Sequence, residues 1–342
     1  MNRETIKETV CKAGIDIGST TVKLVISDEE NRLLFGEYKR HMAHTKDALL
    51  ELLTQAAERL GDRPMQVHIT GSGALGIARS LGIPFTQEVV AVAKALKNYD
   101  PRTDVAVELG GEDAKIIYFT GGLEERMNGV CAGGTGSFID QMASLLQTDA
   151  SGLNEAAAKA KMVYPIASRC GVFAKTDIQP LINDGADRCD LAASVFQAVV
   201  NQTVSGLACG KPIKGRVAFL GGPLHFLPEL KKAFIKTLNL RPDEVIDPEN
   251  SHLFAAMGAA MSEEGTLLTI SELKEKLKAN TKIEYETKRL EPLFRNEEER
   301  QEFSLRHEQA KVHRADIKSY KGKCFLGIDA GSTTTKLALT GA

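Results

Sequence analysis

A short turn near the N-terminus has the composition of a phosphate-binding loop. The segment 16–21, Asp-Ile-Gly-Ser-Thr-Thr, separates two apolar runs that are typical of β-strands. A phosphate needs backbone N–H donors at close range, and Gly18 lets the backbone approach it. Three hydroxyl residues then add donors: Ser19, Thr20 and Thr21. Asp16 stands where an anionic group can hold Mg²⁺ through water. By itself the segment is equally typical of a glycine-containing β-hairpin.

The same arrangement recurs in the segment 108–113, Glu-Leu-Gly-Gly-Glu-Asp. After Asp16 and after Glu108, a glycine follows two positions on and a lysine seven positions on, which indicates two related halves. The second turn adds candidate phosphate contacts at Gly110, Gly111 and Glu112. Two such turns facing each other would clamp a polyphosphate and leave the two leading acids to hold Mg²⁺ or to position attacking water.

The lysines that follow the two turns, Lys23 and Lys115, could each touch a phosphate. A lysine on a hairpin strand more commonly lies on the outer face, in water. We therefore expect both on the surface and assign them no role in the site.

Two other segments are rich in glycine. An apolar strand over residues 217–220 ends in Gly221 and Gly222, and glycines at such a place let a flat base lie against the main chain. Residues 71–76, Gly-Ser-Gly-Ala-Leu-Gly, satisfy the GxGxxG pattern of dinucleotide-binding folds. We assign this second segment no cofactor, because it follows a meander of strands and not the first βαβ unit of the chain.

Cys131 and Cys170 each precede an expected helix. A helix N-terminus stabilises a thiolate and offers N–H donors to inorganic sulfide, which suits an iron–sulfur cluster. The alternative, a pair of small buried residues, stays open because no CxxC pair is present. We read the other cysteines as buried in that way: Cys11, Cys189, Cys209 and Cys324.

The elements that must position these residues follow from hydrophobic periodicity. In the first half, strands are expected within residues 13–27, 32–39 and 66–70, and helices over 46–60, 74–80 and 88–97. In the second half, strands are expected within 105–118 and 216–220, and helices over 135–147, 152–160, 172–184, 187–209 and 252–261. The pattern of a meander followed by alternating helices and strands occurs twice. It predicts an α/β fold of two duplicated lobes, each with a mixed sheet and flanking helices.

The C-terminal part of the chain repeats its beginning. Residues 327–339 match residues 14–26 at nine of thirteen positions, 313 residues later. A hairpin alone cannot bury a core, so we interpret residues 325–342 as the truncated start of a second domain. The expected organisation is a first lobe over 1–100, a second lobe over 101–265 and a charged helical linker over 266–324 that leads to this start.

Composition restricts the classes of partner. The chain has 342 residues, of which 43% are hydrophobic and 26% charged, as in ordinary globular proteins. A formal charge of −2 without a Lys/Arg run argues against nucleic acid as a partner. The N-terminus lacks the apolar core of a signal peptide, and no uncharged apolar stretch reaches about 18 residues. We therefore expect a cytoplasmic protein with no membrane partner, in which the dispersed cysteines are thiols or metal ligands.

The order of these motifs resembles a known family. The first turn, a Thr-Gly loop at 70–73, the acid-x-Gly-Gly turn, Cys-Ala-Gly-Gly-Thr-Gly over 131–136, Cys170 and Gly221-Gly222 resemble the activators of 2-hydroxyacyl-CoA dehydratases, the BadF/BadG/BcrA/BcrD-type ATPases. The resemblance covers about residues 12–265, and the repeat at the C-terminus resembles larger members with two such domains. Three places depart from the family pattern: Glu108 and Glu112 for Asp and Gln, Val92 for a His, and Gly-Gly-Pro-Leu over 221–224 for Gly-Gly-Val-Ala.

The resemblance implies an actin/hexokinase/heat-shock-chaperone-type ATPase fold that binds ATP or ADP with Mg²⁺. It adds Gly133, Gly134 and Thr135 to the nucleotide contacts. It also implies that Cys131 and Cys170 from two subunits of a homodimer hold one [4Fe–4S] cluster. ATP turnover would then drive a low-potential electron to a dehydratase or another iron–sulfur reductase partner.

Two other functions remain open on the sequence. A small-molecule kinase of the same fold would be colourless and would phosphorylate its substrate, whereas the activator would be a brown dimer that contains iron. A nucleotide sensor without turnover is compatible with the altered second turn, and ATPase activity would distinguish it from both.

Overall fold

The computed structural model of the protein describes residues 10–129, 133–168, 170–279, 290–331 and 334–341. The chain forms two compact units, Met1–Ile283 and Glu284–Ala342. None of the helices among the described residues is both long and apolar enough to cross a membrane.

The first lobe is a five-stranded mixed sheet in the order β10-β4-β1-β2-β3. Its strands are β1 (Cys11–Ile17), β2 (Thr21–Ser27), β3 (Leu33–Arg40), β4 (Pro64–Thr70) and β10 (Thr266–Thr269). β1 pairs antiparallel with β2 and parallel with β4. One face of the sheet packs on α1 (Thr45–Leu60), α2 (Leu75–Leu81) and α11 (Ile270–Ala279) in a continuous apolar core. Since helices cover both faces, β1 and β2 are apolar on both sides, as strands buried in this way must be.

The second lobe repeats this design. Its sheet has the order β7-β6-β5-β8-β9, formed by β5 (Val105–Leu109), β6 (Ala114–Tyr118), β7 (Glu124–Met127), β8 (Val217–Leu220) and β9 (Val245–Ile246). β5 pairs antiparallel with β6 and parallel with β8, as β1 does with β2 and β4. Helices α4 (Gly136–Leu145), α5 (Ala150–Ala157), α6 (Gly171–Asn183), α7 (Arg188–Asn201) and α9 (Pro228–Leu238) contribute to its core. A six-residue π-helix (Gln202–Leu207) continues α7, and the short α8 (Gly222–Phe226) follows β8.

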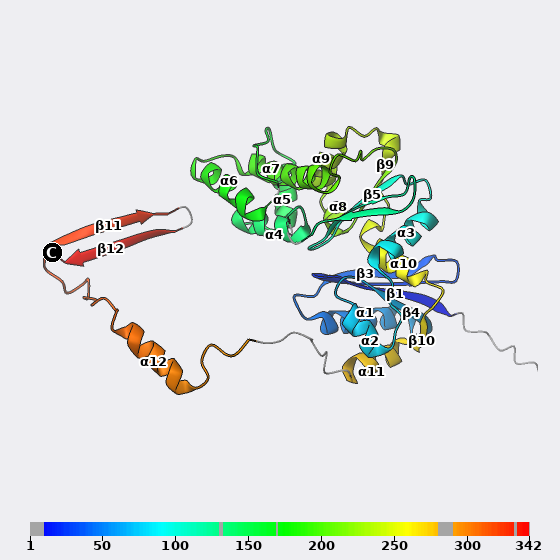
Figure 1. Ribbon diagram of the computed structural model, residues 1–342, viewed down its shortest axis with the longest axis horizontal. Coiled ribbons are helices and arrows are strands. Elements are labelled where there is room, and N and C mark those ends of the chain that lie inside the picture. The colour runs from blue at the N-terminus through cyan, green and yellow to red at the C-terminus, as the bar shows by residue number, and fades with distance from the viewer. Residues whose placement is uncertain (1–9, 130–132, 169, 280–289, 332–333, 342) are drawn as a thin grey trace, which may run out of the picture. The chain divides into compact units, whose positions relative to one another are not determined.

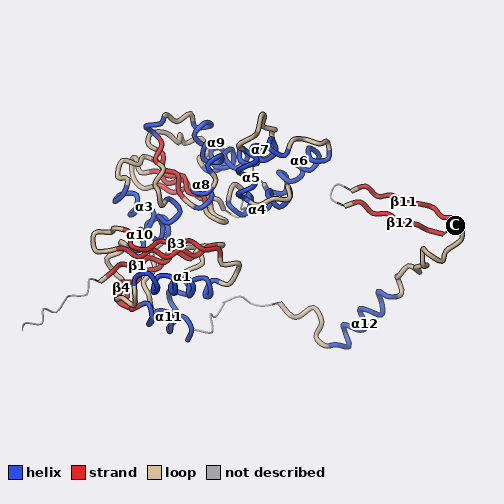
Figure 2. Tube along the Cα trace, turned by 180° about the vertical axis from the view of Figure 1, so that it is seen from behind, coloured by secondary structure: helices blue, strands red, loops and turns tan. Residues whose placement is uncertain are grey.

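Two helices lie between the sheets, α3 (Glu88–Tyr99) and α10 (Phe254–Ala260) (Figures 1 and 2). Their apolar side chains form a third core with residues of both sheets. Two glycines allow the close packing. A Cβ at Gly14 of β1 would lie 1.8 Å from the Ala256 carbonyl oxygen, and one at Gly258 would lie 1.7 Å from that of Ala91. The two lobes are therefore joined through a tightly packed helix pair.

The expected fold of two duplicated lobes, each with a mixed sheet and flanking helices, is confirmed. The expected start of the charged linker at residue 266 is wrong. Residues 266–269 form β10, which pairs with β4, and α11 packs its Leu273 and Leu277 into the first core. This return to the first lobe is set by contacts almost 200 positions apart, for example between the Gln66 amide and the Glu263 carbonyl, and local periodicity does not report such contacts.

The second unit contains α12 (Glu297–Glu308) and the hairpin of β11 (Cys324–Ala330) and β12 (Thr335–Gly341). Helix α12 buries no side chain, which fits the expected solvated helix. In the hairpin, Asp329 lies opposite Lys336, as Asp16 lies opposite Lys23 in the first lobe. Its apolar side chains are exposed on both faces, although the similar segments β1 and β2 of the first lobe are largely buried.

Candidate functional site

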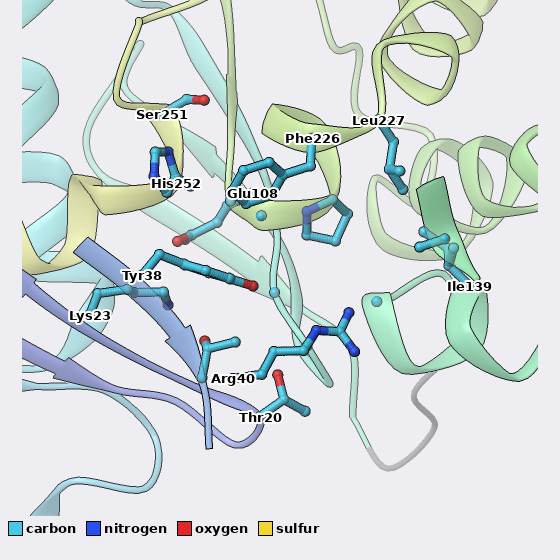
Figure 3. A pocket seen from close by; sticks show the side chains of 18 of the residues that line it. Thr20, Lys23, Tyr38, Arg40, Glu108, Ile139, Phe226, Leu227, Ser251 and His252 are labelled. Carbon is cyan, nitrogen blue, oxygen red and sulfur yellow. The ribbon is translucent and has the colours of Figure 1, made fainter. Parts of the chain in front are cut away.

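A cavity of about 350 Å³ opens between the lobes of the first unit. Its lining comes from the first turn, the end of β3, the start of α3, the second turn, α4, α5, α8 and the start of α10. Tyr38 and Arg40 extend into it from β3, and Phe226, Leu227 and Ile139 face them from the second lobe (Figure 3). Its lining combines charged residues beneath the two turns with apolar residues of α4 and α8, such as Ile139 and Phe226.

The two turns meet in this cavity. A Cβ at Gly111 would lie 1.9 Å from the Thr20 Oγ1, so the second turn approaches the first as closely as a glycine allows. Both turns close in the same way. The Gly18 N–H donates to the Thr21 carbonyl over 2.9 Å, and the Gly110 N–H donates to that of Asp113 over 2.7 Å. Two turns with equivalent backbones thus form one surface.

Glycine segments pack behind each turn. Gly71 has a φ of +107°, and a Cβ at this position would lie 2.4 Å from the Asp16 Oδ1. The Gly73 N–H donates to the Ile17 carbonyl over 2.9 Å. The GxGxxG segment therefore packs against the back of the first turn. Behind the second turn, the N–H groups of Gly136 and Ser137 donate to the carbonyls of Gly110 and Gly111 over 3.0 and 2.7 Å.

Five charged side chains lie together beneath the turns. The Lys23 Nζ is 2.5 Å from the Asp16 Oδ2. The Lys115 Nζ is 3.0 Å from the Glu88 Oε2 and 3.8 Å from the Glu108 Oε2. The expectation that the two lysines lie on the surface is wrong, since their side chains are only 14% and 5% exposed. In each hairpin the lysine lies directly opposite the acid, on the strand face that points into the molecule.

Burial and pairing set the protonation of this group. Burial raises the pKa of Asp16, although Lys23 opposes the shift. Burial raises the pKa of Glu108 to about 7, and Lys115 counteracts this only in part. Burial also acts on Glu88, but the neighbouring Lys115 and Lys23 outweigh it and lower the pKa of Glu88. For the two lysines, burial would lower the pKa, but the neighbouring carboxylates outweigh it and raise the pKa of both.

Two carboxylate oxygens of this group have no hydrogen-bond partner within the described ranges, Asp16 Oδ1 and Glu108 Oε2. A buried oxygen in this state is costly unless a ligand, water or ion completes it. Carboxylate oxygens suit Mg²⁺, which commonly uses one or two carboxylates and takes its remaining ligands from phosphate and water. The described residues contain no cluster of three or more His, Cys, Asp or Glu side chains able to hold a metal without such help. The donor set therefore fits Mg²⁺ brought in with a phosphate.

The sequence model of the BadF/BadG/BcrA/BcrD ATPase family matches residues 13–262, which include every element of this cavity. The chain belongs to this family. The (R)-2-hydroxyglutaryl-CoA dehydratase activating ATPase of Acidaminococcus fermentans is 29% identical over 216 residues, which are 61% of this chain and 81% of the relative. The 2-hydroxyisocaproyl-CoA dehydratase activator of Clostridioides difficile is 27% identical over 253 residues, 72% of this chain and 92% of the relative.

Two solved activator structures share the fold. Component A of the A. fermentans (R)-2-hydroxyglutaryl-CoA dehydratase matches with a TM-score of 0.65 at 24% identity, over 78% of this chain and 99% of that one. The activator of the 2-hydroxyisocaproyl-CoA dehydratase from Clostridium difficile, with bound ADPNP, matches with a TM-score of 0.64 at 23% identity. The match covers 83% of this chain and 100% of that one.

The cavity of this BadF/BadG/BcrA/BcrD ATPase brings together half of the sixteen residues that were proposed from the sequence as nucleotide, catalytic or metal contacts. Those that line it are Asp16, Thr20, Thr21, Glu108, Gly110, Gly111, Gly221 and Gly222. Others lie beside it without lining it: Gly18, Ser19, Glu112, Gly133, Gly134 and Thr135. Of these, Glu112 is exposed, and the loop 133–135 is buried where it leads into α4.

Several lining residues of the family site were missed. Glu88 opens α3, and Tyr38 and Arg40 end β3. The Arg40 guanidinium makes a fork of two hydrogen bonds, 2.7 and 3.2 Å long, with Asp140 of α4 across the cavity. The Tyr38 ring lies near Phe226 and His252, with centroids 5.4 and 5.7 Å apart. No local motif marks these residues; for Tyr38 and Arg40 the polar second half of β3 was the available signal.

The burial of the cysteines differs in part from the expectation. Cys170 is the N-cap residue of α6 and is half-buried, in agreement with its expected place at a helix N-terminus. Cys131 lies outside the described residues. Of the four cysteines expected to be buried, Cys11 is, but Cys189 is half-buried and the other two are exposed: Cys209 and Cys324. Cys209 follows the π-helix and Cys324 begins the exposed hairpin, so neither has a core to enter.

Proposed function

We propose that this chain binds Mg-ATP in the cavity between its lobes, hydrolyses it, and uses the turnover to deliver a low-potential electron to a 2-hydroxyacyl-CoA dehydratase or a similar iron–sulfur partner in the cytoplasm. The contact between the two equivalent turns at Thr20 and Gly111 is the observation that carries the proposal. It is supported by the two buried carboxylate oxygens at the same place, Asp16 Oδ1 and Glu108 Oε2, which lack a hydrogen-bond partner among the described residues. It is also supported by relatives that are named activators of such dehydratases.

In this proposal each part of the cavity has a task. Backbone N–H groups of the two turns, with the hydroxyls of Thr20 and Thr21, bind the phosphates. Asp16 holds Mg²⁺ through water, and Glu108 orients the attacking water and accepts its proton. Bound Mg²⁺ supplies charge neutralisation at the phosphates. Gly221 and Gly222, which line the cavity after β8, let the base lie against the main chain.

Gly111→Ala tests the nucleotide site. The added Cβ would overlap the Thr20 side chain, which forces the turns apart. We expect Mg-ADP to bind about tenfold more weakly or worse, because such displacements disrupt positioned contacts. Isothermal titration calorimetry measures this. Gly129→Ala is the matched control, because nothing lies within 4 Å of a Cβ there. A wild-type protein that shows no heat with Mg-ADP or Mg-ATP would exclude the proposed function.

The electron-transfer part of the proposal rests on Cys131 and Cys170, which we propose as cluster ligands from each subunit of a homodimer. The fit can be judged at Cys170. Its place at the N-cap of α6 favours thiolate, and Val172 and Phe173 beside it are 71% and 64% exposed, leaving this surface open to a second subunit. When bound, a [4Fe–4S] cluster supplies the one-electron chemistry. The thiolate of Cys170 serves to hold it, and the apolar side chains serve to exclude water.

Cys170→Ser is expected to remove at least half of the iron and acid-labile sulfide from protein purified without oxygen, and to weaken dimerisation. Iron and sulfide analysis with light scattering measures both. Cys209→Ser serves as the control, because Cys209 is exposed after the π-helix and is not a proposed ligand. Equal iron in all three proteins would rule out the cluster, and phosphorylation of a small molecule by a colourless protein would favour a kinase instead.

We also propose that β11 and β12 begin a second ATPase domain of the same design, after a linker that starts beyond α11. The support is the shared cross-strand pair of acid and lysine, together with the matching turn. The Gly331 N–H donates to the Thr334 carbonyl over 3.0 Å, as the Gly18 N–H does to that of Thr21.

A further inference from the structure

His41 follows the end of β3 and lies against the first turn. Its backbone N–H donates to the Thr20 carbonyl over 3.1 Å. Its ring Nε2 is 3.2 Å from the Gly18 carbonyl oxygen, and its Nδ1 is 3.1 Å from the backbone nitrogen of Ala43. The side chain is buried, yet it does not line the cavity as Thr20 does. His41 therefore contacts the phosphate turn from outside the cavity.

These contacts determine the tautomer of the ring. Because the Ala43 N–H is a donor, Nδ1 must accept. In the neutral imidazole the hydrogen is then on Nε2, which donates to the Gly18 carbonyl. A trans peptide group is planar, with its N–H directed opposite to its C=O, so fixing the Gly18 carbonyl directs the Ser19 N–H away from the imidazole. The hydrogen bond from the His41 backbone N–H in turn fixes the Thr20 carbonyl, two residues further along the turn.

The chain after His41 is strained in a way that packing does not explain. Met42 and Ala43 have φ of +45° and +65°, in the region that residues with a Cβ avoid. The Met42 side chain is 74% exposed, and Ala43 is exposed too, so neither gains from burial. Strain of this kind persists where surrounding contacts hold it and is concentrated at functional sites. Here the strained pair brings the Ala43 N–H to Nδ1.

We propose that His41 is a positioning residue of the nucleotide site, which holds the carbonyls of the first turn so that its N–H groups stay directed toward a phosphate. This inference rests on the proposed function. It assigns a role to a residue that touches neither nucleotide nor metal and that the family motif in the first turn does not include.

The test compares three substitutions by Mg-ADP titration. His41→Gln can place an amide N–H near the position of Nε2 and keep the bond to Gly18. His41→Asn is too short to do so, and His41→Phe keeps the ring volume without a donor. We expect His41→Gln to bind within about threefold of wild type, and the other two to bind about tenfold more weakly, as the loss of one positioned hydrogen bond predicts. His44→Asn is the control, because the His44 side chain is 76% exposed.

Melting temperatures of the same proteins separate positioning from simple stability. Positioning predicts that His41→Gln and His41→Phe differ in affinity even where their melting temperatures agree. If either His41→Asn or His41→Phe fails to fold, the affinity of the other variant for Mg-ADP decides. Wild-type affinity in a folded His41→Phe, or affinities that follow melting temperature alone, would overturn the inference while leaving the proposed function intact. A wild type that does not bind Mg-ADP would remove both.

Discussion

Glu108→Gln is expected to lower the rate of ATP hydrolysis by about 10²- to 10⁴-fold while Mg-ADP binding stays within about threefold of wild type. The Glu108 carboxylate is buried at the base of the second turn, and its Oε2 has no hydrogen-bond partner within the described residues. Its pKa of about 7 suits a group that takes a proton from water near neutral pH. Glutamine keeps the shape and can still orient water, but it cannot accept the proton.

The same substitution is expected to stabilise the protein without nucleotide at alkaline pH. The pKa of Glu108 is raised by folding from an ordinary 4.5 to about 7, so its contribution is fully present below pH 4.5 and is lost as the pH rises through about 7. For a single buried group this loss is about 3 kcal/mol, on the basis of 1.36 kcal/mol per pH unit. A glutamine at this position does not ionise and carries no such loss. The two proteins should be equally stable near pH 4.5, and the variant should be the more stable one at pH 8.

Hydrolysis assays and urea unfolding across this pH range measure the two effects. Glu124→Gln is a suitable control, since Glu124 lies on β7 of the same sheet but is exposed and pairs with Arg126 and Lys211. Turnover by Glu108→Gln at the wild-type rate would contradict its role as the base. A stability difference that does not grow with pH would contradict the raised pKa.

The parts of the site that could be predicted from sequence are those encoded over a few neighbouring residues. The turns at 16–21 and 108–113 are recognisable because a hairpin turn and its phosphate-binding N–H groups depend on local glycine and hydroxyl residues. Their matched spacing also predicted the duplicated fold. The structure then shows a buried acid opposite a lysine in each hairpin, Asp16 with Lys23 and Glu108 with Lys115, whereas the spacing alone had led us to expect both lysines on the surface.

The parts that could not be predicted depend on contacts between distant segments. Glu88 reaches Lys115 because α3 lies between the two sheets, and nothing near Glu88 in sequence announces that position. Arg40 meets Asp140, a hundred positions away, only after the lobes have packed together. The lysines were misjudged for the same reason, since a hairpin by itself has no inner face until helices cover it.

Lys115→Met is expected to destabilise the protein by about 3–5 kcal/mol at pH 8, because removing one partner leaves buried carboxylates uncompensated. The Lys115 side chain is 5% exposed and lies between Glu88 and Glu108. The loss should shrink toward pH 5. Unpaired buried carboxyls have raised pKa values, take up protons as the pH falls, and so cease to carry an uncompensated charge. Denaturant unfolding at both pH values measures the change.

A second substitution decides whether charge or packing is responsible. Glu88→Gln in the Lys115→Met background removes the carboxylate closest to the missing ammonium group, so the double variant should recover about 1–3 kcal/mol. If lost packing were the cause, Glu88→Gln would restore nothing. Lys336→Met is the matched control, because the Lys336–Asp329 pair has the same cross-strand register but side chains that are 70% and 64% exposed. Water already solvates both of those charges, and the expected change there is below about 1 kcal/mol. The acid–lysine motif is thus expected to contribute strongly to stability in the buried hairpin and weakly in the exposed one, because helices enclose only the former.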